Sequence, residues 1–310
     1  MAALICGSLA YDTIMVFPDQ FKNHILPDKV HILNVSFLVP RMRREFGGCA
    51  GNIAYNLKLL GGDPIPMATV GGDFGPYREW FAEMDIPLDQ VKEIPELFTP
   101  QAFITTDHDN NQITAFHPGA MMRSFENHVK NVPGVTFGIV SPDGREGMLQ
   151  NAREFAELGI PFIFDPGQAM PLFNGEELRA FIEQADYVTV NDYESNLLQE
   201  RTGWDETTIA GKVKAYITTQ GPRGATIHAD GTSHHVPPAH ERRVTDPTGC
   251  GDAFRAGLIF GIEKGYDWPT IGRIGNLMGA LKVEHPGTQN QRFDYEEFSE
   301  QFRQQFGYAL

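Results

Sequence analysis

The sequence predicts an α/β fold: a doubly wound, mostly parallel sheet with helices on both faces, and a small β-sheet lid beside it. After residue 135, short apolar runs recur at intervals of about 25 residues, with segments of helical spacing between them. Strand, helix and strand in this rhythm are typical of βαβ units. The first 120 residues instead contain alternating segments and a hairpin, which indicate a second, smaller sheet.

The second half of the chain supplies the parallel strands. The predicted strands are the apolar runs at 135–143, 160–167, 186–194 and 215–221. Segments with helical spacing separate them, at roughly 146–158, 175–185 and 193–202. Ligands bind beyond the carboxyl ends of the strands in such sheets. The polar side chains at those ends are therefore candidates for a site: Asp143, Asp165, Asn191, Glu194 and Thr219.

The first half supplies the lid. The run ALICGSLAYD predicts one core strand, and QAFITTDHDNNQITAFHPG predicts a hairpin with its turn at DHDNN. We expect the lid to come from about 14–46 and 98–119, within a single domain over 1–310. Two further elements are expected, a helix from Ala50 to Leu60 with a glycine pair at each end, and a hairpin that turns at Asp230.

Composition narrows the function. The chain has 310 residues, 41% of them hydrophobic, and a net charge of −15. Because no basic run interrupts this acidity, we expect neither nucleic acid nor a membrane surface as a partner. Three well-separated cysteines predict neither a disulfide framework nor a zinc site. The N-terminus does not look like a signal peptide, so the expected location is the cytoplasm.

The stretch RVTDPTGCGDAFRAGLIFG predicts an apolar helix with an anion hole at its start. The unpaired N–H groups at the helix start lie beside three small residues, Gly249, Cys250 and Gly251. Small side chains allow an anion to approach these N–H groups closely. The spacing alone favours two roles for Asp252 equally. It is either a base that accepts a proton from an attacking hydroxyl or the N-cap of the helix. A dinucleotide-binding loop is disfavoured, because the last glycine of GxGxxG is missing. Arg255 is expected either at a phosphate or in a structural ion pair.

Five motifs in order resemble those of the ribokinase or PfkB family of sugar and nucleoside kinases. DPTGCGDAFRAG and FGGCAGNIAYNLKLLGG are similar to its two signatures. NDYE resembles its NxxE motif, TTQGPRGA its nucleotide loop, and GSLAYD its N-terminal substrate strand. TDHDNNQIT and FDPGQ further resemble the nucleoside-kinase branch, which includes adenosine kinases. Cys250 stands where the family usually has alanine. Because the expected role of this residue uses its backbone N–H group, we expect the small cysteine side chain to be tolerated.

The resemblance implies roles at the reacting groups. Asp252 would be the general base, and the N–H groups of Gly249, Cys250 and Gly251 would bind the γ-phosphate as charge develops. On the acceptor side, the residues implied in sugar binding are Asp12, Gly47, Gly48 and Asn52.

The resemblance also implies the cofactors ATP and Mg²⁺. Asn191 and Glu194 would organise Mg²⁺ and its waters, and Thr219 and Gly221 would line the ATP groove. Asp246 would help to bind a monovalent cation such as K⁺, in relatives that use one.

These observations predict an ATP-dependent kinase for the 5′-hydroxyl of a nucleoside, with adenosine preferred and purine salvage as its context. A kinase for ribose, fructose or a sugar phosphate is the alternative, since three arginines precede Gly47: Arg41, Arg43 and Arg44. A nucleoside-binding protein without catalysis is the alternative of another class. The exposed face of the lid would allow a homodimer.

Overall fold

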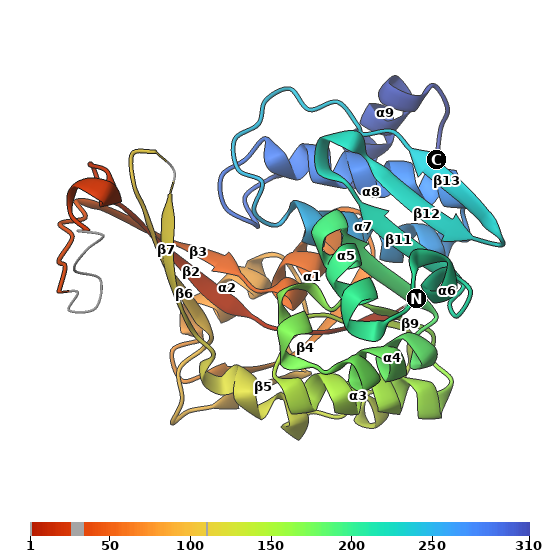
Figure 1. Ribbon diagram of the computed structural model, residues 1–310, viewed down its shortest axis with the longest axis horizontal. Coiled ribbons are helices and arrows are strands. Elements are labelled where there is room, and N and C mark those ends of the chain that lie inside the picture. The colour runs from red at the N-terminus through yellow and green to blue at the C-terminus, as the bar shows by residue number, and fades with distance from the viewer. Residues whose placement is uncertain (1, 26–33, 110) are drawn as a thin grey trace.

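The computed structural model describes residues 2–25, 34–109 and 111–310, and within them two separate sheets organise the chain (Figure 1). The larger sheet has the order β13-β12-β11-β10-β9-β8-β1-β4-β5. Within this order, the neighbouring strands β11, β10, β9, β8, β1, β4 and β5 pair in parallel, and β12 and β13 add an antiparallel edge next to β11. The bounds are β1 Ala2–Cys6, β4 Asp63–Gly71, β5 Val91–Ile94, β8 Val135–Val140, β9 Phe162–Phe164, β10 Tyr187–Asn191, β11 Ala215–Thr219, β12 Ala225–Ala229 and β13 Thr232–Val236.

Helices cover both faces of the large sheet, as predicted. Neighbouring residues of one strand, such as Ile139 and Val140 in β8, belong to two different buried clusters. The first cluster joins the sheet to α1, α7, α8 and α9, and the second joins it to α3, α4 and α5. The bounds are α1 Cys49–Leu59, α2 Gly75–Glu83, α3 Arg145–Leu158, α4 Gly175–Gln184, α5 Asp192–Thr202, α6 Glu206–Ala210, α7 Cys250–Lys264, α8 Trp268–Val283 and α9 Tyr295–Phe306. Short 3₁₀ helices lie at Phe21–Asn23, Gly119–Glu126, Val129–Asn131, Gly167–Leu172 and Gly221–Arg223. No helix in the described ranges is long and apolar enough to cross a membrane.

The smaller sheet is the predicted lid, and it projects from the body of the molecule (Figure 1). Its order is β3-β2-β6-β7, in which β2 and β6 pair in parallel and the other pairs are antiparallel. The bounds are β2 Ala10–Val16, β3 Arg41–Gly47, β6 Gln101–Thr106 and β7 Gln112–His117. Of the predicted lid, residues 26–33 and 110 lie outside the described ones.

The prediction of one strand over ALICGSLAYD is wrong, because the run supplies β1 to the body and β2 to the lid. The chain passes between the sheets at Gly7, where a Cβ would lie 2.3 Å from Ser141 Oγ. Next to it, the Ser8 carbonyl accepts the N–H groups of Ala50 (3.0 Å) and Gly51 (3.4 Å) at the start of α1. The strand is therefore interrupted by close packing and by a contact with a helix far along the chain.

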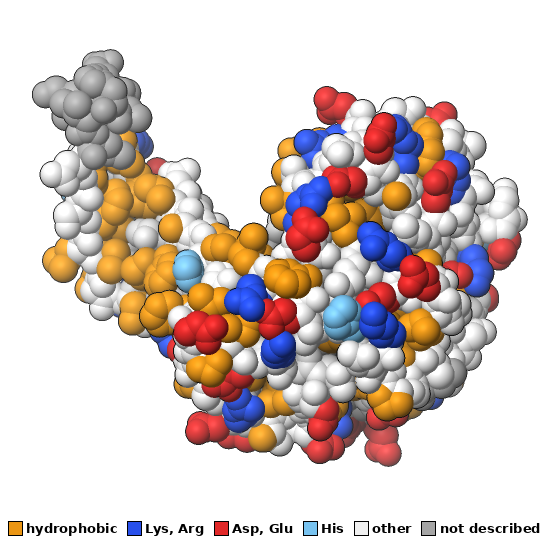
Figure 2. Space-filling model, turned by 90° about the horizontal axis from the view of Figure 1, so that it is seen from below, with side chains coloured by type: hydrophobic (Ala, Val, Ile, Leu, Met, Phe, Trp, Pro, Cys, Tyr) orange, Lys and Arg blue, Asp and Glu red, His pale blue; other side chains and the backbone are white. Residues whose placement is uncertain are grey.

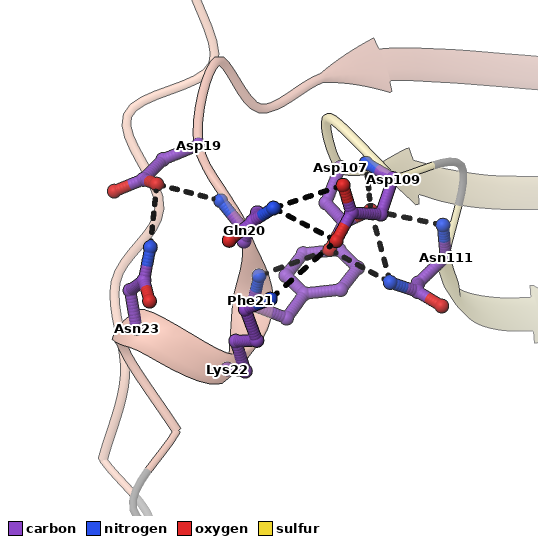
Figure 3. A network of polar contacts seen from close by, with 8 residues as sticks. All are labelled: Asp19, Gln20, Phe21, Lys22, Asn23, Asp107, Asp109 and Asn111. Atoms are coloured by element: carbon purple, nitrogen blue, oxygen red, sulfur yellow. Dashed lines mark hydrogen bonds and ion pairs between the residues drawn. The ribbon is translucent and has the colours of Figure 1, made fainter.

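Hydrogen bonds at the tip of the lid join its two segments (Figure 3). The Asp107 carboxylate accepts the backbone N–H groups of Phe21 (3.0 Å), Asp109 (2.9 Å) and Asn111 (2.9 Å). Gln20 Nε2 donates to Asp109 Oδ2 at 2.8 Å. The β6–β7 turn and the segment after β2 are therefore held together.

Candidate active site

Helix α7 begins at Cys250, and its N-cap is Gly249 in the left-handed region at φ +81°. A Cβ on Gly249 would lie 3.0 Å from Thr288 Cγ2, so glycine satisfies both the backbone conformation and the close packing. Asp252 lies in the first turn of the helix and caps nothing, so the N-cap interpretation of Asp252 is wrong. Its carboxylate instead accepts a hydrogen bond from Asn52 Nδ2 at 2.8 Å.

The environment of Asp252 places its titration near neutral pH. Burial raises the pKa of Asp252 to about 6, against the lowering effects of Arg255 and of the hydrogen bond from Asn52. Asp12 raises it further. A carboxylate with a pKa just below the working pH is ionised and still basic enough to accept a proton, which is what a general base requires.

A buried chain of amides and hydroxyls holds Asn52. Gln289 Nε2 donates to Asn52 Oδ1 (3.0 Å) and to the Tyr77 hydroxyl (2.7 Å). Tyr77 in turn donates to the Gly47 carbonyl at 2.8 Å. The predicted sugar-binding glycine and the predicted base are thus joined through Gln289 and Tyr77, which the sequence did not single out. Neither residue lies in a motif, and only their burial and position reveal them.

The predicted sugar-binding residues meet where β2 and β3 leave the body. A Cβ on Gly47 would lie 2.6 Å from Asp12 Oδ2, so the glycine leaves the backbone bare beside the carboxylate. Gly48 is the N-cap of α1 at φ +85°, where a Cβ would clash with the Ser8 carbonyl. Burial raises the pKa of Asp12 to about 6, and the nearby carboxylates of Glu45 and Asp246 add to the effect.

A cavity of about 300 Å³ adjoins the helix mouth. Thr219 and Gly221, the predicted ATP-binding residues, line it from β11 and the turn after it. Cys250 and Gly251 line it from α7 and Gly279 from α8, so the cavity is continuous with the predicted anion hole. Burial raises the pKa of the Cys250 thiol to about 11, which disfavours the reactive thiolate.

Asn191 and Glu194 form a capping box at the start of α5. Asn191 Oδ1 accepts the Glu194 N–H, and Glu194 Oε2 accepts the Asn191 N–H, both at 2.8 Å. This explains their spacing through helix capping. Glu194 Oε2 also lies 3.9 Å from Arg255 Nη2, and the negative charge of Glu194 raises the pKa of Asp252. Within the described residues, no group of three or more Asp, Glu, His or Cys side chains could hold a metal by itself. Mg²⁺ fits such a site only with waters and phosphates as its other ligands.

Arg255 forms a structural ion pair, one of its two expected roles. Its Nε lies 2.5 Å from Asp165 Oδ2, and its Nη2 donates to Asp165 Oδ1 at 2.6 Å. Both side chains are buried. The pair fixes the first turns of α7 against the carboxyl end of β9, where Asp165 follows the strand.

Asp246 lies on the loop before the anion hole and fixes its shape. Its carboxylate accepts the N–H groups of Thr248 (3.0 Å) and Gly287 (3.0 Å). Burial acts to raise the pKa of Asp246, but these hydrogen bonds and the charge of Lys282 outweigh it and lower the pKa. The carboxylate is therefore ionised and already occupied by backbone donors.

The ribokinase-like fold and the similarity to known kinases together define an ATP-dependent kinase. The chain belongs to the pfkB family of carbohydrate kinases, whose model matches residues 11–293. This family is the one that the sequence motifs predict.

Individual relatives agree with this assignment. A structure of Burkholderia thailandensis nucleoside kinase in complex with inosine has 52% sequence identity and a TM-score of 0.91, covering 99% of both chains. The same enzyme in complex with ADP-inosine gives a TM-score of 0.88 at 53% identity, covering 99% of this chain and 97% of that one. The nucleoside kinase of Methanothermobacter thermautotrophicus is 32% identical over 98% of this chain and 96% of its own.

Proposed function

We propose that the protein is a nucleoside kinase that transfers the γ-phosphoryl group of ATP to the 5′-hydroxyl of a purine nucleoside. The observation that carries the proposal is the Asp252 carboxylate in the first turn of α7, which Asn52 holds by a hydrogen bond. The predicted sugar-binding carboxylate of Asp12 is close enough to raise the pKa of Asp252, and the cavity lies beside the same helix mouth. The relative solved with inosine supports a purine nucleoside as the substrate. Adenosine, the sequence-based prediction, and inosine are the first two substrates to compare.

In the proposed reaction Asp252 accepts the proton of the 5′-hydroxyl while that oxygen attacks the γ-phosphorus. The bond between the γ-phosphorus and the bridging oxygen breaks, and ADP leaves. The N–H groups of Gly249, Cys250 and Gly251 would stabilise the charge on the transferred group. Asp12 would accept hydrogen bonds from the two ribose hydroxyls, since each carboxylate oxygen takes one donor.

ATP would occupy the cavity lined by Thr219 and Gly221. Mg²⁺ neutralises phosphate charge when bound, and Glu194 would hold it through waters. Asn191 fixes the Glu194 backbone and is not needed as a direct ligand.

A sugar phosphate remains the alternative substrate, because Arg43 lies on the same face of the lid as Asp12. Its Nε is 3.4 Å from Glu45 Oε1, and its Nη2 is 4.0 Å from Asp246 Oδ2. Arg44 points to the other face, where its guanidinium lies 5.0 Å from the Tyr11 ring centroid. Two acidic neighbours already engage Arg43, which favours an uncharged nucleoside.

The test is ADP release from Mg·ATP with adenosine, inosine, guanosine, cytidine, ribose, fructose and fructose 6-phosphate. We expect turnover with purine nucleosides, and a loss of about 10²–10⁴-fold in Asp252→Asn with unchanged binding of inosine. Asp85→Asn is the matched control, because Asp85 is an exposed carboxylate outside the site. Turnover with sugars alone would overturn the nucleoside assignment. Nucleoside binding without turnover in any of these would favour the binding protein.

A further inference from the structure

Lys282 is fully buried in the last turn of α8, directly behind the loop that leads to the anion hole. Its Nζ donates to the backbone carbonyls of Asp246 (2.7 Å) and His285 (3.1 Å). Lysine is almost never fully buried unless its charge is compensated. Here the compensation comes from carbonyl oxygens, and the C-terminal end of a helix adds partial negative charge.

The loop that carries Asp246 is attached to the same end of α8. The N–H groups of Thr245 (2.8 Å) and Asp246 (3.1 Å) both donate to the Val283 carbonyl. The Asp246 carboxylate then fixes Thr248 and the turn toward the anion hole. Lys282 therefore holds one end of a short loop whose other end supplies the phosphate-binding N–H groups.

The charge of Lys282 acts on the site itself. Burial lowers the pKa of Lys282, whereas Asp246, Cys250 and Asp252 raise it and Arg43 lowers it. The same interaction appears at Cys250, where Lys282 lowers the thiol pKa against the effect of burial. A positive charge at this place favours phosphate in the anion hole and the ionised form of the general base.

Backbone carbonyl oxygens are also the ligands that hold K⁺ in proteins. The sequence predicted a monovalent cation at Asp246, but the Asp246 carbonyl accepts Lys282 and both of its carboxylate oxygens accept backbone N–H groups. A second cation does not fit beside the ammonium, since the two charges would share one carbonyl in a buried place.

We propose that the Lys282 ammonium is the built-in monovalent cation of this site, so that phosphate binding and transfer need no K⁺. Lys282 is a positioning residue, because it acts through the Asp246 loop and never touches the reacting atoms. The inference rests on the proposed function only for its kinetic readout; binding of a nucleotide tests it independently.

The first experiment uses the wild-type protein in K⁺, Na⁺ or tetramethylammonium chloride at one ionic strength. Affinity for a non-hydrolysable ATP analogue, the unfolding temperature and the rate with inosine are measured in each salt. We expect the affinities and the rates in the three salts to agree within about twofold, and the unfolding temperatures to agree. A tenfold gain in affinity or rate with K⁺ would overturn the proposal.

The second experiment separates charge from packing. Lys282→Met fills the space without charge, and Lys282→Ala opens room for a small cation. We expect both to lose at least tenfold in analogue affinity, with K⁺, ammonium or ethylammonium restoring only Lys282→Ala. Lys264→Met, in the exposed last turn of α7, is the control that keeps wild-type affinity. A loss in Lys282→Met without rescue in Lys282→Ala would assign Lys282 a purely structural role and overturn the proposal.

The outcomes also separate this proposal from the proposed function. If the wild type phosphorylates no nucleoside, the proposed function fails, while the binding of the analogue in the three salts still decides the role of Lys282. If both variants fail to fold, that salt series on the wild type remains decisive.

Discussion

At the residue scale, Asp252 and Asp12 predict the pH dependence of the reaction. Burial raises the pKa of each carboxyl to about 6, and in the proposed reaction both must be ionised, one to accept a proton and the other to accept ribose hydroxyls. We therefore expect kcat/KM to be constant above about pH 7 and to fall below pH 6. Two protonations make the fall steeper than first order. Initial rates from pH 4.5 to 8.5 measure it.

The Asp12→Asn variant provides the control for this assignment. It removes one of the two titrations, so the acid limb should become first order while the overall rate falls. An unchanged second-order limb in Asp12→Asn would show that another group titrates.

Asn52 predicts a shift of the same acid limb. Its amide donates to Asp252, and this hydrogen bond lowers the pKa of the carboxyl. We expect Asn52→Ala to move the acid limb of kcat/KM to higher pH and to lower the plateau. The matched control is Asn23→Ala, which removes an exposed hydrogen bond to Asp19. A limb that stays in place would contradict a direct effect of Asn52 on Asp252.

At this scale the sequence identifies residues that carry a chemical signature. Asp252, Asn52 and Gly47 lie in quotable motifs, and the structure brings them into one hydrogen-bonded chain. Gln289 and Lys282 cannot be found in this way. Gln289 is buried and contacts side chains that are far away in the sequence, and Lys282 is buried and donates to backbone carbonyls. No local sequence pattern indicates either kind of contact.

At the element scale, the two ends of α7 allow one substitution to be compared in two settings. Gly249 and Gly265 both have φ between +70° and +85°, the N-cap at +81° and the C-cap at +72°. Alanine in this region costs roughly 1–2 kcal/mol. A Cβ at Gly265 would meet no atom of the described residues within 4 Å, whereas at Gly249 it would meet Thr288.

We therefore expect Gly265→Ala to lower stability only, and Gly249→Ala to lower both stability and turnover. Chemical denaturation and rates with inosine measure the two effects. Equal turnover in the two variants would show that the shape of the anion hole does not depend on Gly249.

Elements are predicted well where their sequence pattern is local. The strands β8, β9, β10 and β11 follow apolar runs, and the glycine pairs mark the ends of α1. The split between β1 and β2 was missed, because both halves are apolar and only packing at Gly7 separates them. The short edge strand β5 was missed as well, since half-exposed edge strands lack a continuous apolar run.

At the scale of the whole molecule, buried carboxyls predict that stability falls as pH rises. Burial raises the pKa of Asp143 to about 8, against the hydrogen bond from the Gly144 N–H. Its unfolded value is about 3.9, so the folded protein binds more protons between these values. Each such proton makes the free energy of unfolding fall by up to about 1.4 kcal/mol per pH unit.

We expect the free energy of unfolding to fall between pH 5 and pH 8, and Asp143→Asn to make this fall shallower. Denaturation by urea at four pH values measures both. Asp85→Asn, at an exposed position, should keep the wild-type slope. A stability that rises over this range would contradict the prediction.

The lid predicts the oligomeric state. Strand register puts Met42, Phe103 and Ile113 on the face of the lid opposite Asp12, and they are 69%, 41% and 44% exposed. Figure 2 shows hydrophobic side chains gathered over the lid, where it stands clear of the body. Large exposed apolar patches mark interaction surfaces, and a two-fold dimer uses the same patch on both copies.

We infer that two lids pack through this face in a homodimer, with each Asp12 face left open to its own nucleoside. Light scattering should give twice the 34.5 kDa of one chain. The double variant Met42→Glu with Ile113→Glu should give a monomer, because like charges would meet across the two-fold axis. Met122→Glu, exposed outside the lid strands, should leave the dimer intact. A wild-type monomer at micromolar concentration would contradict the inferred dimer.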